Sequence, residues 1–149
     1  IGGYTTDIAL VANRRIDLNF FESLDFGVIF LYNEIADVVR KNHGKGINGI
    51  LIEAILKGEN IGDDDVEETV KAVTDNYAKR LISSLRDRKI DMELSLPVLV
   101  GGGAQLMEQY LRRAIPRNEV LIVPDVRANA IGYEVFANRI LKERQKSTF

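Results

Sequence analysis

The sequence contains no cysteine, a single histidine and no long apolar run. The lack of cysteine excludes disulfides and thiolate metal sites, and it agrees with a reducing, cytoplasmic environment. With His43 as the single histidine, a multi-histidine metal site is excluded and a Ser-His-Asp triad is disfavoured. No apolar stretch approaches the roughly 20 residues that span a bilayer. We therefore expect a cytoplasmic protein without a membrane partner.

The charges show no excess of either sign. The 149 residues carry 20 Lys and Arg against 22 Asp and Glu, which gives a net charge of −2. Such a chain has no general attraction to nucleic acid, so a DNA partner would require a local patch or an adaptor protein. The hydrophobic fraction of 46% is enough for the core of one domain, or of a domain with a small subdomain.

The apolar pattern predicts a hairpin followed by helices. Residues 4–12 and 15–22 alternate apolar and polar side chains, which is typical of a β-hairpin. Apolar residues then recur at helical spacing, which predicts consecutive helices at residues 27–42, 48–57 and 64–88.

Two details of these helices are open to a direct test. The second helix is expected to turn one apolar face inward, made of Ile50, Leu51, Ala54 and Ile55. At the start of the third helix, the spacing from Asp64 to Glu67 resembles a capping box in which Asp replaces Ser or Thr.

The last third of the chain predicts alternating strands and helices. The continuous apolar run 96–100 suits a strand that is buried on both faces of a helix-covered sheet. A helix at 104–115 and a strand at 120–123 follow, and Asn129 is expected to cap a last helix that reaches about Lys142. This order predicts a parallel strand pair, and the chain is therefore assigned to the α/β class.

Two glycine clusters about a hundred residues apart carry the functional signal. Gly2 and Gly3 lie at a bend, and Thr5, Thr6 and Asp7 follow them closely. Backbone amides and threonine hydroxyls at such a bend suit phosphate oxygens, and Asp7 suits a water of hydrated Mg²⁺. An ordinary glycine-containing β-turn with strand-favouring threonines would also explain this cluster.

The second cluster, Gly101 to Gly103, joins an apolar strand to a helix. Free amides and bare backbone at this point suit a polar ligand edge or the flat face of a purine. The spacing matches neither the dinucleotide fingerprint nor a Walker loop. A tight strand-to-helix turn that requires positive φ is the alternative explanation.

Together and in this order, the two clusters resemble the second half of the superfamily that contains actin, the heat-shock chaperone ATPases and the sugar kinases. The run Ile1–Asp7 matches that superfamily's second phosphate loop, Asp-x-Gly-Gly-x-Thr-x-Asp, after its first Asp. Val98–Gly103 matches its adenosine motif, a hydrophobic strand that ends in Gly-Gly-Gly/Ala. Within the superfamily, the segments 25–35 and 128–133 are similar to plasmid-segregation actins of the ParM/StbA type.

The resemblance implies a ribonuclease H-like, actin-type domain with a mixed sheet and flanking helices. Residues 1–32 and 93–149 would form the α/β core, and residues 33–92 an inserted, mainly helical subdomain. The small residues of the superfamily's tightly packed connecting helix would correspond to Ala128, Ala130 and Gly132.

The resemblance also implies ATP and Mg²⁺ as ligands. The phosphate-binding residues would be Gly2, Gly3, Tyr4, Thr5 and Thr6. The adenosine-binding residues would be Gly101, Gly102, Gly103, Glu53 and Lys57. Asp7 would hold the metal through water. For Glu53 and Lys57, a simple surface ion pair four residues apart is the alternative interpretation.

Part of the superfamily's machinery falls outside these residues. The first Asp of the motif would precede Ile1, and the first phosphate loop belongs to the other domain. We therefore expect a domain II fragment without a catalytic residue, with weak ATP binding and negligible hydrolysis. The intact protein would hydrolyse ATP, form filaments and segregate plasmid DNA through an adaptor. A phosphotransferase, a chaperone-type ATPase and a non-enzymatic interaction domain are the alternatives.

Overall fold

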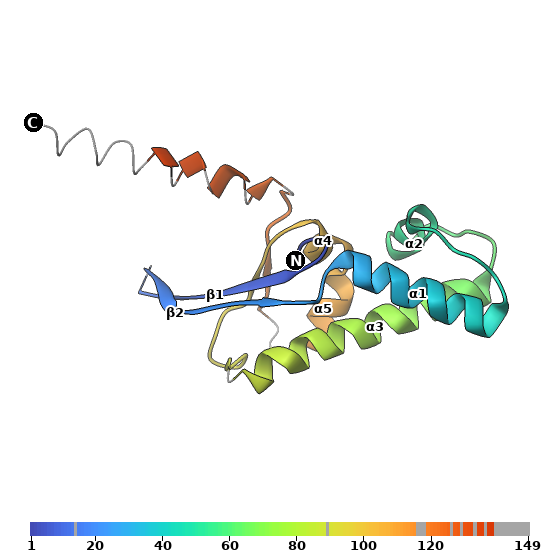
Figure 1. The fold of residues 1–149 in the computed structure, drawn as a ribbon, viewed down its shortest axis with the longest axis horizontal. Helices are drawn as coiled ribbons and strands as arrows, with labels where there is room; N and C mark the ends of the chain where they lie inside the picture. The colour runs from blue at the N-terminus through green and yellow to red at the C-terminus, as the bar shows by residue number, and fades with distance from the viewer. Residues whose placement is uncertain are drawn as a thin grey trace, which may run out of the picture.

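The fold combines a β-hairpin, a group of packed helices and a short parallel strand pair (Figure 1). The computed structural model describes residues 1–13, 15–88, 90–115, 119–125, 127–128, 130–132, 134–135 and 137–138, without the side chains of residues 18 and 19. The predicted cap Asn129 and the predicted helix end at Lys142 lie outside the described residues. The predicted α/β class is confirmed, because the described residues combine helices with one antiparallel and one parallel strand pair.

The hairpin forms where the alternation predicts it. Strand β1 (Thr6–Ala12) pairs antiparallel with β2 (Arg15–Leu24), and the register shifts between Ala9 and Val11. Asn13 takes a positive φ of 52° in the turn, a conformation that asparagine tolerates better than most residues. The second strand is two residues longer than predicted, and it brings the chain to the start of the first helix.

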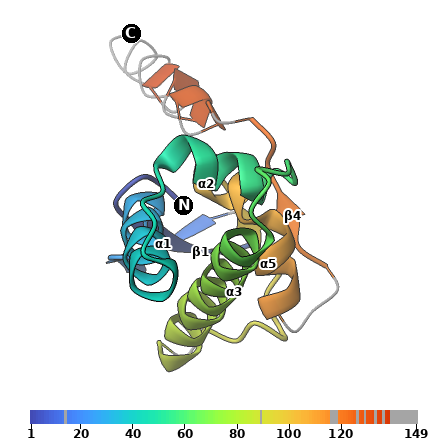
Figure 2. The same ribbon diagram turned by 90° about the vertical axis from the view of Figure 1, so that its right-hand side faces the viewer.

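Three consecutive helices follow the hairpin, within a residue of their predicted bounds: α1 (Val28–His43), α2 (Gly49–Leu56) and α3 (Asp64–Asp87). The long α3 packs against α1, α2 and α5 (Glu108–Ala114), and it lies between α1 and α5 in Figure 2. The centre of the core consists of side chains with almost no exposed area: Leu31, Ile35, Val39, Val70, Leu81, Met107 and Leu111. Helix α3 is thus the scaffold on which the other helices are arranged.

The predicted inward face of α2 is correct for Ile55 but wrong for Ile50 and Leu51. Ile50 is 80% exposed and Leu51 is also exposed, whereas Ile52, Ile55 and Leu56 are buried. The sequence of α2 is apolar on nearly every side, so its periodicity does not distinguish one face from another. Packing against α3 and α1 selects the buried face.

The predicted capping box of α3 is also wrong. The N-cap is Asp63, whose side chain accepts a hydrogen bond from the Val66 amide at 3.4 Å. Glu67 is buried, and its carboxylate accepts a hydrogen bond from the Ile61 amide at 2.8 Å. Three consecutive aspartates offer three possible helix starts, and the preceding linker decides which of them is used.

The two late strands pair in parallel, as predicted, but they are short and one face of the pair is exposed. Strand β3 (Val98–Leu99) pairs with β4 (Leu121–Ile122). The expectation that this strand is buried on both faces is wrong, because Val98 is 53% exposed and Leu121 is 55% exposed. In the described part of the chain, helices cover one face of this pair, on which Leu99 and Ile122 contact the core.

The predicted helix at 104–115 is divided in two and starts earlier. Helix α4 (Gly102–Leu106) begins within the glycine cluster, and α5 follows after Met107. The Met107 backbone, with φ −96° and ψ 12°, lies outside the helical region and separates the two helices. The side chain of Met107 is buried at this break.

The described residues of the segment 128–138 are helical. This segment extends away from the rest of the molecule in Figure 1. A Cβ built on Gly132 would meet no atom within 4 Å, so the close packing expected at this residue is not formed within the described chain. Among the described residues, none of the helices has the combined length and apolar character required to cross a bilayer.

Candidate functional site

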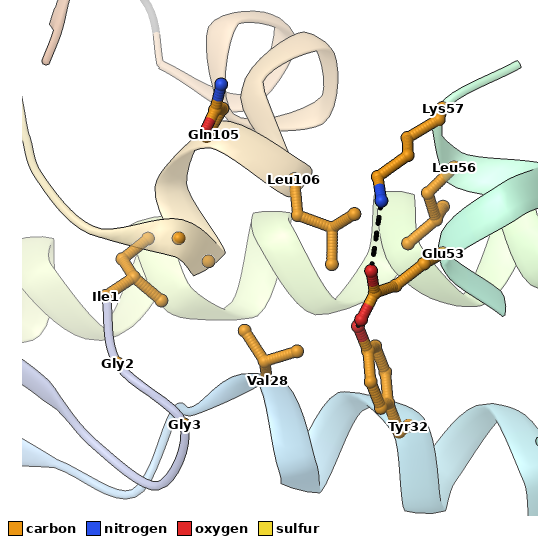
Figure 3. Close-up of a pocket in the computed structure, with 12 residues that line it drawn as sticks. Ile1, Gly2, Gly3, Val28, Tyr32, Glu53, Leu56, Lys57, Gln105 and Leu106 are labelled. Atoms are coloured by element: carbon orange, nitrogen blue, oxygen red, sulfur yellow. Dashed lines mark hydrogen bonds and ion pairs between the residues drawn. The ribbon is translucent and has the colours of Figure 1, made fainter. Parts of the chain in front are cut away.

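A cleft of about 750 Å³ lies between the first residues of the chain, α1, α2 and α4. Its lining consists of bare glycine backbone, apolar side chains and a few polar groups (Figure 3): Ile1, Gly2, Gly3, Val28, Tyr32, Glu53, Leu56, Lys57, Gly102, Gly103, Gln105 and Leu106. The structure thus brings Gly2, Gly3, Gly102 and Gly103 together with Glu53 and Lys57. These are six of the residues predicted from the sequence.

The first glycine cluster holds the start of α1. The Gly2 carbonyl accepts a hydrogen bond from the Val28 amide at 3.1 Å, and the Gly3 carbonyl accepts one from the Ile29 amide at 2.8 Å. These bonds satisfy amides that a helix start leaves without an intrahelical partner. The approach requires Gly27, because a Cβ there would lie 2.3 Å from the Gly3 carbonyl oxygen.

The second glycine cluster contacts the first directly. The Ile1 nitrogen donates to the Val100 carbonyl at 2.5 Å, and the Gly103 amide donates to the Ile1 carbonyl at 3.3 Å. Gly101 has φ 102°, and a Cβ there would lie 2.6 Å from the Ile1 carbonyl oxygen. A Cβ on Gly103 would lie 2.7 Å from side-chain carbons of Ile1 and Val28. Gly101 and Gly103 are therefore required by packing.

Two of the amides expected to face a ligand have internal partners. The Gly2 amide donates to the Thr5 carbonyl at 2.8 Å, and the Gly103 amide is bonded to Ile1. Among the described residues, no hydrogen bond from the Gly3 or Gly102 amide is found. The expectation of free amides is thus corrected for Gly2 and Gly103, which contribute bare backbone surface to the cleft.

A tyrosine, a carboxylate and an ammonium group form the opposite wall of the cleft. The Tyr32 hydroxyl donates to Glu53 Oε1 at 2.8 Å, and Lys57 Nζ donates to Glu53 Oε2 at 3.1 Å. The hydrogen bond from Tyr32, followed by that from Lys57, lowers the pKa of Glu53. Burial and the Glu53 carboxylate raise the pKa of Tyr32. Glu53 and Lys57 thus form the surface ion pair and also line the cleft.

The remaining predicted site residues lie outside the cleft lining. Tyr4 is exposed beside the turn that Gly2 and Thr5 form. Thr6 is buried, and its hydroxyl donates to the Phe26 carbonyl at 2.5 Å. Asp7 is exposed on β1, where its carboxylate accepts a hydrogen bond from Ser23 Oγ at 2.6 Å.

Several lining residues were not predicted from the sequence. Tyr32 lies on the apolar stripe of α1, and its spacing alone predicts a core residue. Gln105 follows the triple glycine closely, which is the one signal that would have indicated it. The apolar lining residues Val28, Leu56 and Leu106 carry no sequence signal that distinguishes them from core positions.

The cleft suits an organic ligand with a flat apolar part and polar ends. Its apolar side chains and glycine backbone can contact a ring, while the Glu53 carboxylate, Lys57 ammonium and Gln105 amide supply polar contacts. Among the described residues, no group of three His, Asp or Glu side chains is arranged to hold a metal ion.

Two comparisons with known proteins find similarity, one to a protein family and one to solved structures. Residues 1–113 match the family described as "Archaeal actin homologue MreB-like, C-terminal". No curated protein matches the chain significantly in sequence.

The fold is similar to that of Ta0583, an archaeal actin homologue. Its native structure has a TM-score of 0.69 and 23% sequence identity, over 93% of this chain and 46% of that one. The structure of Ta0583 in complex with ADP has a TM-score of 0.66 and 22% identity, over 93% and 48% of the two chains. The chain therefore spans about half the length of Ta0583. Since the family match extends over most of the sequence, the chain belongs to the archaeal MreB-like actin homologues, as their C-terminal part.

Proposed function

We propose that these residues form the nucleotide-binding half of an actin-like ATPase whose ligand is ADP or ATP. The observation that carries the proposal is the meeting of two glycine clusters, distant in sequence, at a cleft that Glu53 and Lys57 also line. The ADP complex of Ta0583, which has the same fold, supports this choice of ligand.

In the proposed binding mode, the two ends of the cleft hold different parts of the nucleotide. The turn at Gly2 and Gly3, with Tyr4 and Thr5 beside it, lies at the phosphate end. Thr6 stabilises this turn through its bond to Phe26 and has no hydroxyl proton left for phosphate. The adenosine lies against Gly102 and Gly103, with Gly101 shaping the turn and with Glu53 and Lys57 within reach of its polar groups.

We also propose that Mg²⁺ accompanies the nucleotide and that Asp7 holds it through water. Asp7 is a carboxylate of the type that holds a water of hydrated Mg²⁺. It is exposed outside the cleft lining, however, and hydrogen-bonded to Ser23. Within the described part of the chain, no group of three His, Asp or Glu side chains is placed to bind the ion directly, so the proposed contact runs through water.

The proposed ATPase requires a second half. Because phosphoryl transfer depends on holding the phosphates and the attacking water in line, a second phosphate-binding surface must face this one. The chain covers about half of Ta0583, which is compatible with a partner domain in the full-length protein. Filament formation by that protein, plasmid segregation through an adaptor, the ParM/StbA kinship and the helical insertion at 33–92 are further proposals, carried by the motif resemblance.

A glycine variant in the full-length protein tests the proposal. A Cβ on Gly3 would meet Ile29 at 3.6 Å, an ordinary contact, so Gly3→Ala is compatible with the fold and adds a methyl group at the phosphate end. We expect calorimetry to show ADP and ATP binding by the wild type and a loss of at least tenfold in affinity for Gly3→Ala.

Gly46→Ala is the matched control, because a Cβ there meets nothing within 4 Å and Gly46 lies outside the cleft. It should bind nucleotide like the wild type. A full-length protein that binds neither ADP nor ATP would refute the proposal and favour an interaction domain whose glycines serve turns.

A further inference from the structure

Tyr77 of α3 is a buried tyrosine to which neither the motifs nor the proposed function assigns a role. Its hydroxyl donates to the Gly27 carbonyl, 50 positions away in the sequence, at 2.9 Å. Its ring meets the ring of Phe26 edge-on, with the centroids 5.3 Å apart. The Arg80 guanidinium, which is paired with Glu34, lies over the same ring at 5.5 Å from the centroid. The neighbours of the ring thus hold the tyrosine hydroxyl in one place.

The carbonyl that Tyr77 contacts belongs to the segment that holds the first glycine cluster. Gly27 directly precedes α1, and the first two amides of α1 donate to the carbonyls of Gly2 and Gly3 at 3.1 and 2.8 Å. Gly27 and Gly3 are in closer contact than any side chain permits, because a Cβ on Gly27 would lie 2.3 Å from the Gly3 carbonyl oxygen. Figure 3 shows Gly3 beside the start of α1. A displacement of Gly27 therefore displaces the Gly2–Gly3 turn as well.

The hydrogen bond from Tyr77 is not required to satisfy the Gly27 carbonyl. The same carbonyl accepts a hydrogen bond from the Leu31 amide at 3.3 Å, so it keeps a partner when the tyrosine hydroxyl is removed. The bond from Tyr77 is the shorter of the two, and it ties the start of α1 to α3. Burial raises the pKa of Tyr77 to about 12, so the hydroxyl keeps the proton that it donates at neutral pH.

We propose that Tyr77 is a positioning residue that places the Gly2–Gly3 turn for the phosphates of a bound nucleotide, through the Gly27 carbonyl. The inference rests on the proposed function, in which this turn lies at the phosphate end of the cleft. It adds that a residue of α3 outside the cleft lining determines phosphate affinity. A small displacement of the turn misaligns its contacts with the phosphates. The adenosine lies against α2 and α4 in the proposed binding mode, so its contacts should be unaffected.

The test compares ADP with adenosine, which lacks the phosphates, in the full-length protein. The wild type should bind ADP more tightly than adenosine. Tyr77→Phe removes the hydroxyl and keeps the ring, so we expect calorimetry to show ADP binding weakened by about three- to tenfold, the range of one hydrogen bond. Adenosine binding should stay nearly unchanged, which lowers the ratio of the two affinities. Phe26→Leu keeps the hydroxyl but removes the ring that Tyr77 contacts, and it should shift this ratio in the same direction.

Tyr110→Phe is the matched control. Tyr110 is also buried, with Arg113 over its ring, and lies outside the cleft lining, so this variant should keep the wild-type ratio. An unchanged ratio in Tyr77→Phe, or an equal loss for ADP and adenosine, overturns the positioning role while the proposed function stands. If circular dichroism shows that Tyr77→Phe is unfolded, the ratio in Phe26→Leu decides. A wild type that binds neither ligand overturns both proposals.

Discussion

The glycines around the cleft differ in what they require of their surroundings. Gly27, Gly101 and Gly103 lie where another backbone or side chain comes closer than a Cβ permits. At Gly3, in contrast, a Cβ would make only an ordinary contact. The turn explanation of the triple glycine therefore holds for Gly101 and Gly103. It leaves the ligand-facing explanation for Gly3.

Substitution of Gly101 is predicted to destabilise the fold. In Gly101→Ala the backbone must keep φ near 102° and the new Cβ must avoid the Ile1 carbonyl oxygen at 2.6 Å. We expect a loss of about 1–3 kcal/mol in the free energy of unfolding, measured by urea denaturation. Gly46→Ala, in open space without positive φ, should change it by less than about 0.5 kcal/mol. Equal stability of the two variants would contradict the packing described here.

The titration of Glu53 should report on its bond to Tyr32. The folded pKa of Glu53 is held below its usual value of 4.5, first by the Tyr32 hydrogen bond. The contact therefore stabilises the folded state above pH 4.5, and this contribution is lost as the pH falls through the lowered pKa. In Tyr32→Phe the pKa should rise towards 4.5, which ¹³C NMR of the carboxyl carbon can follow. An unchanged pKa would mean that Lys57 alone orients the carboxylate.

At the scale of elements, α3 holds both walls of the cleft in place. Its Tyr77 donates a hydrogen bond to the Gly27 carbonyl at 2.9 Å, directly before α1, and stacks edge-on against Phe26 at 5.3 Å. Near the N-terminus of α3, the buried Glu67 carboxylate accepts a hydrogen bond from the Ile61 amide, which lies in the linker after α2. Helix α3 is thus hydrogen-bonded both to the residue before α1 and to the linker after α2.

The start of α3 provides a test of the corrected cap. The Asp63 carboxylate accepts hydrogen bonds from the Val66 amide and from the Lys45 ammonium group. Asp64, in contrast, is exposed in the first turn. We expect Asp63→Ala to lower the free energy of unfolding by about 1 kcal/mol, the typical value of an N-cap. Asp64→Ala should cost only a few tenths of a kcal/mol, through the helix dipole. Thermal unfolding of both variants distinguishes the two assignments, and a larger loss for Asp64→Ala would restore the capping box.

At the scale of the whole molecule, the described residues form a cleft with one glycine-rich wall and one side-chain wall. Apolar side chains away from the cleft are also uncovered, including Leu94, Val98 and Leu121. Both features agree with a chain that spans about half of its structural relatives.

The proposal that a second phosphate-binding surface must face this one predicts a difference in ATP affinity between the isolated chain and the full-length protein. The isolated 149 residues should bind ATP at least tenfold more weakly and hydrolyse it negligibly, because the phosphates are held from one side. Calorimetry and phosphate release measure the two quantities. Circular dichroism of the isolated chain is the control for folding. Tight ATP binding by the folded, isolated chain would contradict the proposal.

Much of the local structure could be predicted from the sequence because it depends on neighbouring residues. The period of α1 and α3, the hairpin alternation and the strand–glycine–helix order each require only short-range information. The buried face of α2 could not be predicted, since Ile50 and Ile52 are equally apolar. The break at Met107 could not be predicted either, because the side chain that fills it is an ordinary helix former.

The sequence by itself determined the types of most elements and the two glycine motifs, and with them the resemblance to the actin superfamily, whereas the family match is to archaeal MreB-like actin homologues. Only the tertiary structure decided that Gly2 and Gly103 line the same cleft and that Thr6 and Asp7 are outside its lining. It also decided that Tyr32, which its spacing assigns to the core, faces a carboxylate. The physical reason is that spacing along the chain determines which face of an element a residue occupies. What that face meets depends on the packing of segments distant in sequence.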